Sequence, residues 1–449
     1  MQQPVIYRAP LTFGQLSLWR SIQGLSPEVC NLPQLWTLPT GTSLASVERA
    51  LGTLEDRHES LRTRYEADGV QSLTQAVWES AAVSLDVVEA GGDGSGEGAA
   101  AVAEKLAAAP FDLAVDRPWR AYAVTCGGVA SRLAICFHHI AVDAWAINQL
   151  NEEFLALLDG RLLPGTAPSP RELAEDQWSA ARQGRRKSAR RYWQQIFEAA
   201  PAMERDDAAE VAPTRWAKVS SAAAADAAGQ IASRLEVSVP SVVLTAFCLA
   251  LGQHTGREKV LAAVYANNRS DPRWEKLIAA QNQIIPLLFA PDPDEEFDAA
   301  VRRLHWETLR SYRHGSYNVD DVVELGREYG YTGSVNGCFD GSVSGFFRYF
   351  FNYLGEYQKG QSSPEKEIQT GTAGRNIGVP IYLQVQDGEA LTFTLRENSS
   401  SGGFDRVKGL LLTLQDIILA AGRKSRQNSS NSASRLFPAG PVHPQIRAL

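Results

Sequence analysis

Two adjacent histidines and a nearby aspartate form the strongest chemical pattern in this sequence. His138 and His139 follow a short apolar run, and Asp143 lies four residues beyond His139. Imidazole exchanges protons near neutral pH, because its unperturbed pKa is about 6.5, so this pattern is typical of acid–base chemistry. From the residues alone, three other interpretations stay open. The histidines could be loop residues, Asp143 could only cap the next helix, or His139 and Asp143 could face a metal ion.

A metal site is the weakest of these interpretations. Such a site normally needs three or four converging ligands, and no other His or Cys cluster lies nearby in the sequence. The five cysteines are widely scattered, at Cys30, Cys126, Cys136, Cys248 and Cys338. We therefore expect buried thiols rather than disulfides or metal ligands, and no bound metal.

The elements next to the histidines follow from apolar spacing. Residues 121–124 and 131–137 read as short strands separated by two glycines, and residues 144–158 have the spacing of a helix. The histidines should therefore stand where a strand ends and shortly before a helix begins. Upstream, residues 43–61 have helical spacing and residues 81–88 alternate like a strand.

Both halves of the chain mix short strands with longer helices, which predicts an α/β fold. Residues 162–170 are linker-like, and a polar, basic helix follows through residues 183–193. We place the N-terminal lobe, with the histidine pattern, at residues 1–175 and the C-terminal lobe at 176–422. Residues 423–449 are rich in Ser, Asn, Pro and Arg, so we expect a disordered tail.

Composition excludes several classes of protein. The 449 residues are 44% hydrophobic and 21% charged, as in ordinary globular proteins. A net charge of −7 argues against a nucleic-acid surface, which needs clustered cations. No run of eighteen apolar residues predicts a membrane span, and the first residues lack a secretory signal. We expect a cytoplasmic enzyme with neither a membrane nor a nucleic acid as partner.

Several ordered segments resemble the condensation domains of nonribosomal peptide synthetases. Residues 12–19 look like the opening motif of that family and residues 57–65 like its second motif. Residues 138–145 are similar to its HHxxxDG signature. Residues 111–113, with Pro118 and Arg120, form a landmark before that signature, and further landmarks follow it in the family's order, at residues 237–241, 255–258, 266–269, 282 and 351–353. The resemblance covers roughly residues 10 to 420.

The resemblance implies two chloramphenicol-acetyltransferase-like lobes arranged as a V, with the histidine motif at the centre of a tunnel. An acyl or peptidyl carrier protein would present the donor thioester on its phosphopantetheine arm, and no cofactor would be bound by the chain itself. The acceptor would come on a second carrier protein or as a free small molecule. The span without an adenylation or carrier segment suggests a free-standing condensation enzyme.

The family pattern also implies roles for individual residues. His139 would be catalytic and His138 its structural partner, while Asp143 would form an ion pair with Arg62 that supports the motif. Candidate tunnel-lining groups are Ala144, Trp145, Asn282 and Ser344, and candidate carrier-docking groups are Arg185, Arg186, Arg190 and Arg191. Ala144 replaces the glycine usual after the aspartate. Its methyl group either favours the following helix, the simpler interpretation, or narrows the tunnel.

The function expected from this resemblance is amide formation between an acyl or peptidyl thioester and an amine. Aminolysis of a thioester needs approximation, removal of the amine's proton and stabilisation of the developing oxygen charge. An acyltransferase that forms esters from alcohols would use the same histidine chemistry. A catalytically silent carrier-binding or recruitment module is a further alternative, because folds are reused without their chemistry.

Overall fold

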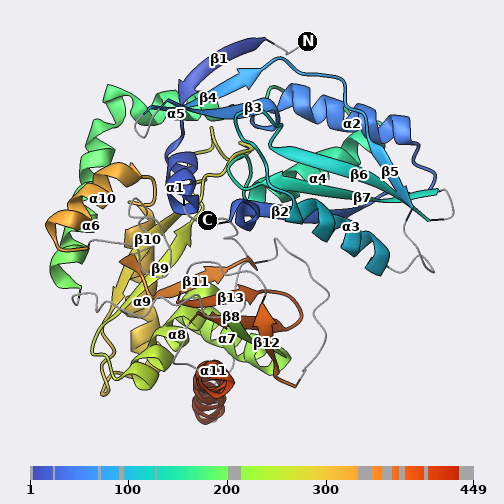
Figure 1. Ribbon diagram of the computed structural model, residues 1–449. Helices are drawn as coiled ribbons and strands as arrows, with labels where there is room; N and C mark the ends of the chain where they lie inside the picture. Colours follow the sequence, from blue (N-terminus) through green and yellow to red (C-terminus); the bar gives the residue numbers. More distant parts are fainter. Residues whose placement is uncertain are drawn as a thin grey trace, which may run out of the picture.

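The computed structural model describes residues 4–23, 26–68, 72–89, 96–126, 129–200, 214–331, 346–355, 367–373, 380–398 and 403–433. Within these ranges the chain forms three separate β-sheets, with helices packed against them (Figure 1). The α/β class expected from the sequence is confirmed.

Two smaller sheets come from the first third of the chain. The three-stranded sheet has the antiparallel order β1-β4-β3, and the four-stranded sheet has the order β2-β7-β6-β5, in which β5 runs parallel to β6. Their strands are β1 (Val5–Pro10), β2 (Asn31–Thr37), β3 (Thr63–Asp68), β4 (Ser72–Trp78), β5 (Asp86–Glu89), β6 (Trp119–Cys126) and β7 (Val129–His138).

The third sheet is larger and comes from the second half of the chain, with the order β10-β9-β11-β13-β14-β8-β12. Strand β11 lies parallel to both of its neighbours, β9 and β13. The strands are β8 (Thr214–Ser221), β9 (Val260–Ala266), β10 (Gln283–Phe289), β11 (Tyr349–Tyr353), β12 (Gln369–Ala373), β13 (Ile381–Gln386) and β14 (Leu391–Glu397).

Helices cover these sheets and bury their apolar faces. Helices α2 and α4 share one core with the four-stranded sheet, and α3 packs on β2, β6 and β7 in another. The helices are α1 (Phe13–Ile22), α2 (Leu44–Arg57), α3 (Gly96–Ala108), α4 (Ala144–Leu158), α5 (Pro170–Trp178), α6 (Gln183–Ala199), α7 (Ala222–Leu235), α8 (Val239–Thr255), α9 (Phe297–Tyr312), α10 (Val319–Glu328) and α11 (Phe404–Ala433), with 3₁₀ turns at Pro27–Cys30, Glu59–Arg62 and Ala180–Arg182.

The elements around the histidines agree with the sequence predictions. Strand β7 ends at His138, and α4 has the predicted bounds. The predicted strand over residues 81–88 is shorter, because only Asp86–Glu89 pairs with β6. Cys30, Cys136 and Cys248 are buried and are not joined in disulfides, as expected.

The C-terminal prediction needs a correction. Helix α11 continues to Ala433, so the start of the predicted disordered tail is helical. Leu410, Leu411, Leu414 and Ile418 are buried and establish the helix, and adding further turns to an existing helix costs little. Residues 434–449 lie outside the described ranges. The predicted lobe boundary at residues 175 and 176 falls inside α5.

In the described part of the chain, no single helix is long and apolar enough to cross a membrane. Helices α7 and α8 together pass the same test of length and composition, but they are bent by 110° where they meet.

Candidate active site

His139 occupies the turn between β7 and α4, and its ring orientation is fixed by a backbone carbonyl. Its Nδ1 lies 2.8 Å from the carbonyl oxygen of Val142. A carbonyl oxygen can only accept, so Nδ1 carries the proton and Nε2 is left as the proton acceptor of the neutral ring. The backbone N–H of His139 donates to the carbonyl of Cys30, at 2.8 Å. These two backbone contacts orient the half-buried side chain so that Nε2 can accept a proton.

His138 is buried at the end of β7 and has a different environment. Its Nδ1 accepts a hydrogen bond from the backbone N–H of Ile140, at 3.2 Å, and the edge of Phe111 packs against its ring. Burial, with a smaller contribution from the charge of Arg120, lowers the pKa of His138 to about 3. His138 is therefore a neutral, structural residue at neutral pH.

Asp143 forms a buried, two-pronged ion pair with Arg269. Arg269 Nη1 lies 2.7 Å from Oδ2, and Nη2 lies 3.0 Å from Oδ1. The two carboxylate oxygens also accept from the backbone N–H groups of Ala146 and Gln281, at 3.0 and 3.1 Å. Four donors therefore surround this carboxylate, which both caps α4 and joins it to a distant segment.

The predicted pairing of Asp143 with Arg62 is wrong. The Arg62 guanidinium instead donates to the carbonyls of Glu55 and Trp78, at 3.2 and 2.7 Å. These carbonyls lie in α2 and at the end of β4, close to Arg62 in the fold, and they occupy its donors locally. Arg62 therefore ties the first helices to the three-stranded sheet and does not touch the motif's aspartate.

Arg269 lies in the segment between β9 and β10, residues 267–282, which we call the β9–β10 segment. Its Nη2 also donates to the carbonyls of Leu277 and Ala279, both at 3.2 Å. Its guanidinium carbon lies 4.5 Å from the centre of the Trp145 ring. Trp145 thus covers the ion pair, and the β9–β10 segment connects the seven-stranded sheet to the histidine motif.

Two residues of the second motif hold the carbonyls that follow His139. The hydroxyl of Ser60 donates to the carbonyl oxygen of Ala141, and the hydroxyl of Tyr65 lies 3.4 Å from that of Ile140. Gln15, in the opening motif, reaches the Tyr65 hydroxyl at 3.3 Å. The three separated motifs therefore meet at one loop.

Two of the candidate tunnel-lining residues lie close to the Asp143 network. Ala144 is the first residue of α4 and is not among the described residues with positive φ, so its position does not require glycine. Asn282 is half-buried between Gln281 and the start of β10. Ser344 lies outside the described residues.

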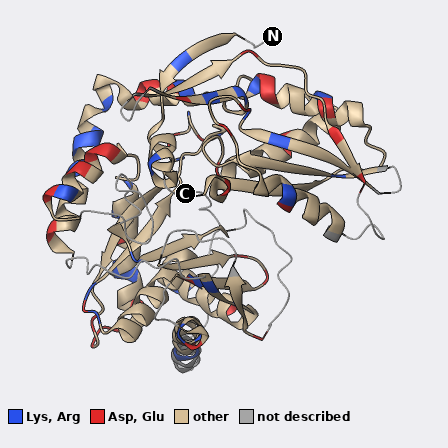
Figure 2. Ribbon diagram, in the orientation of Figure 1, with Lys and Arg blue, Asp and Glu red and all other residues tan. Residues whose placement is uncertain are grey.

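The basic run on α6 is partly neutralised by α10. Arg190 pairs with Glu328 at 3.4 Å, and Arg186 donates to the carbonyl of Gln177 at 2.9 Å. Burial raises the pKa of Asp321 on α10, and the charges of Arg186 and Arg190 oppose that rise. Figure 2 shows acidic and basic bands alternating where these two helices lie together. Of the four candidate docking residues, Arg185 and Arg191 are exposed.

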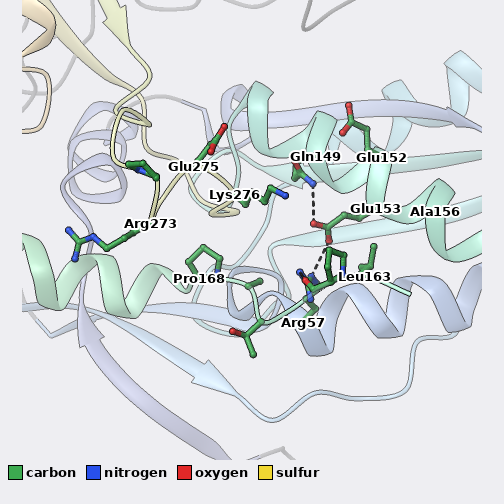
Figure 3. A pocket seen from close by; sticks show the side chains of 14 residues that line it. Arg57, Gln149, Glu152, Glu153, Ala156, Leu163, Pro168, Arg273, Glu275 and Lys276 are labelled. Carbon is green, nitrogen blue, oxygen red and sulfur yellow. Dashed lines mark hydrogen bonds and ion pairs between the residues drawn. The ribbon is translucent and has the colours of Figure 1, made fainter. Parts of the chain in front are cut away.

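A cavity of about 400 Å³ lies between α2, α4 and the outer turn of the β9–β10 segment (Figure 3). Gln149 donates to Glu153 at 3.1 Å, and Lys276 reaches in from the segment. Burial favours the neutral form of Glu153, but a 2.7 Å hydrogen bond from His58 and the charge of Arg57 outweigh it and lower the pKa of Glu153. Neither motif histidine lines this cavity, so it is separate from the histidine motif.

Comparison with known protein families identifies the family of this chain. The family model for the condensation domain matches residues 7–373. This chain belongs to the condensation domain family. Similar proteins include the AMB antimetabolite synthetase AmbB of Pseudomonas aeruginosa, 28% identical over 348 residues, and the beauvericin nonribosomal cyclodepsipeptide synthetase of Beauveria bassiana, 27% identical over 298 residues.

These relatives are much longer than this condensation domain. The aligned region is 74% of this chain but 27% of the Pseudomonas synthetase, and 63% of this chain but 9% of the Beauveria synthetase. The comparison therefore concerns one part of each relative.

Solved structures confirm the fold. The condensation domain from the monacolin K polyketide synthase MokA superposes with a TM-score of 0.76 at 17% identity, covering 93% of this chain and 98% of that chain. The condensation domain involved in chain release from the enacyloxin polyketide synthase gives 0.71 at 22% identity, covering 93% and 83%.

Most of the contacts that support the site come from residues whose roles were not predicted from the sequence. Ser60, Tyr65 and Arg269 all lie inside segments that resemble family motifs. The resemblance does not predict which groups they contact, because partners such as Arg269 and Asp143 lie 126 residues apart in the sequence.

Proposed function

We propose that this condensation domain transfers an acyl or peptidyl group from a carrier-bound thioester to an amine, forming an amide. The amine nitrogen attacks the thioester carbonyl, and Nε2 of His139 accepts a proton from that nitrogen. Collapse of the tetrahedral intermediate breaks the carbon–sulfur bond, and the proton passes to the departing thiolate. The products are an amide and a free thiol on the carrier's phosphopantetheine.

The observation that supports this proposal is the tautomer of His139. The Nδ1–H···O contact with Val142 leaves Nε2 as the proton acceptor, which is the state that a general base requires. The Arg269 guanidinium and the backbone donors around Asp143 hold the turn in place without using His139. Asp143 is therefore proposed as a supporting residue and not as a proton carrier.

A first experiment replaces His139 with alanine. We expect a folded protein whose product formation falls by roughly a hundredfold or more, the usual scale for a positioned acid–base group. The matched control is His254→Ala, which removes an exposed histidine on α8, and it should keep full turnover. Wild-type turnover in a folded His139→Ala protein would overturn the assignment.

Ester formation is a second candidate, favoured by similarity to a synthetase whose name describes a cyclodepsipeptide product. Depsipeptides contain ester bonds, and an alcohol would lose its proton to His139 as an amine does. Matched amine and alcohol acceptors should be offered with one acyl thioester and the products weighed by mass spectrometry. Faster ester formation would replace the amide proposal, and no product from any pair would favour a silent recruitment module.

The donor is proposed to arrive on a carrier protein. The phosphopantetheine arm and the bound carrier supply a local concentration that a free thioester lacks, so truncation of the donor should lower the rate as well as the affinity. One acyl group should be compared on a carrier protein, on coenzyme A and on a short thiol. Equal efficiency for all three would contradict this proposal.

A further inference from the structure

Helix α9 carries an exposed apolar and cationic face that the rest of the fold does not cover. Its inner face packs on α8 and β10 through buried residues at helical spacing, Ala300, Val301, Leu304, Thr308 and Ser311. On the outer side Trp306 is 68% exposed, and Leu309 and Tyr312 are 39% and 42% exposed. Exposed aromatic residues that lie together are typical of protein interfaces.

Positive charge surrounds these apolar side chains. Residues 297–313 contain four arginines and two acidic residues. Both acids are paired, Asp298 with Arg234 at 2.5 Å and Glu307 with Arg310 at 2.5 Å. Arg313 is exposed and has no partner among the residues that the structure describes. Arg310 is 63% exposed beside Glu307, and Arg313 adds a second exposed cation, so the α9 face keeps a net positive charge that complements an acidic surface.

The C-terminal end of α9 leads directly to the support of the active site. The ring of His314 stacks on Tyr192 of α6, with centroids 4.8 Å apart. The carbonyl of Gly315 accepts from Asn268 Nδ2 at 3.0 Å, and Asn268 precedes Arg269, which holds Asp143. A protein bound on the α9 face would thus sit beside the β9–β10 segment.

We propose that the α9 face, comprising Trp306, Leu309, Arg310, Tyr312 and Arg313, is a docking surface for an acidic carrier protein. This inference rests on the proposed carrier-dependent function. Trp306 inserts into an apolar depression of the carrier, while Arg310 and Arg313 face its acidic side chains. Tryptophan and arginine supply much of the binding energy of interfaces, and charges at the rim mainly speed association.

The test measures binding apart from chemistry. An apo acyl carrier protein and an apo peptidyl carrier protein, which lack the phosphopantetheine arm, would be titrated against wild type, Trp306→Ala and an Arg310→Glu, Arg313→Glu double variant. We expect each variant to weaken binding about tenfold or more. The wild-type affinity should fall with added salt, and the charge-reversed variant should show a weaker salt dependence.

Matched controls separate this surface from general effects. Leu162→Ala and Arg161→Glu change exposed residues between α4 and α5 and should leave binding unchanged. Arg185→Ala with Arg191→Ala tests the rival surface on α6. Equal binding by the α9 variants and wild type, loss of binding only in the α6 variant, or no carrier binding by wild type would each overturn the proposal.

Turnover of a short pantetheine thioester with an amine tests the catalytic proposal separately. The α9 variants should keep that activity while they lose turnover of the carrier-bound donor. A loss of both activities in folded α9 variants would show that the face supports the active site rather than a partner, and would contradict docking. Failure of wild type with every thioester would count against the proposed function instead.

Discussion

Arg269 and Asp143 balance each other's buried charge, with exposed fractions of only 4% and 6% for their side chains. Arg269→Ala would leave the carboxylate without its partner, and breaking such a pair typically costs about 3–5 kcal/mol. We expect the free energy of unfolding, measured by urea denaturation, to fall by that amount. Arg273→Ala is the matched control, because this arginine lies in the same segment but is 55% exposed. Equal stability of the two variants would contradict the central role of the pair.

The burial of His138 predicts a dependence of stability on pH. Its pKa is lowered to about 3 in the folded protein, from about 6.5 in the unfolded chain. Between these values the unfolded chain binds more protons, so acidification from pH 7 favours unfolding. The stabilisation is fully present above about pH 6.5 and is lost as the pH falls towards 3.

The measurement compares melting temperatures from pH 7.5 to 4.5 for wild type and His138→Asn. The asparagine oxygen can accept from Ile140 but does not titrate in this range, so the variant should lose less stability on acidification. His254→Asn, which changes an exposed histidine, should follow the wild-type profile. Parallel profiles for all three proteins would show that His138 does not carry the effect.

At the scale of elements, helix α1 approaches the β9–β10 segment so closely that only glycine fits. A Cβ atom on Gly14 would overlap the carbonyl oxygen of Ala280, which is backbone and cannot turn aside. We expect Gly14→Ala to displace one of the two elements and to lower both the melting temperature and turnover. The control is Gly52→Ala in the middle of α2, where a Cβ meets nothing within 4 Å. That change should stabilise by about 0.5–1 kcal/mol, because alanine favours helix.

Local sequence patterns predicted the helices and strands around the histidines, but they did not predict contacts between residues far apart in the sequence. Helix α4 was predictable from its apolar spacing and from Asp143 as its cap. The partner of Asp143 was not, since both Arg62 and Arg269 lie in motif-like segments and only the fold decides which one reaches it. Residues 81–85 alternate like a strand but do not pair, because alternation records burial on one face and not the presence of a neighbouring strand.

For the whole molecule, contacts between distant segments predict that the two halves unfold together. Asp143 binds Arg269, and Arg20 of α1 donates to Asp320 of α10 at 2.8 Å. We expect tryptophan fluorescence and far-ultraviolet circular dichroism to report one coincident urea transition for wild type. In Arg269→Ala this shared transition should move to a lower urea concentration. Two transitions in the wild-type protein would contradict this coupling.

The ion pair between Asp143 and Arg269 also sets a rule for recombining this domain with its relatives. Any single crossover placed between residues 143 and 269 takes the aspartate from one parent and the arginine, with the loop that presents it, from the other. Such a hybrid separates Asp143 or Arg269 of this chain from the backbone that brings the pair together. Hybrids that exchange the β9–β10 segment along with the N-terminal half keep one parent's geometry intact, and libraries built in that way should yield more folded members.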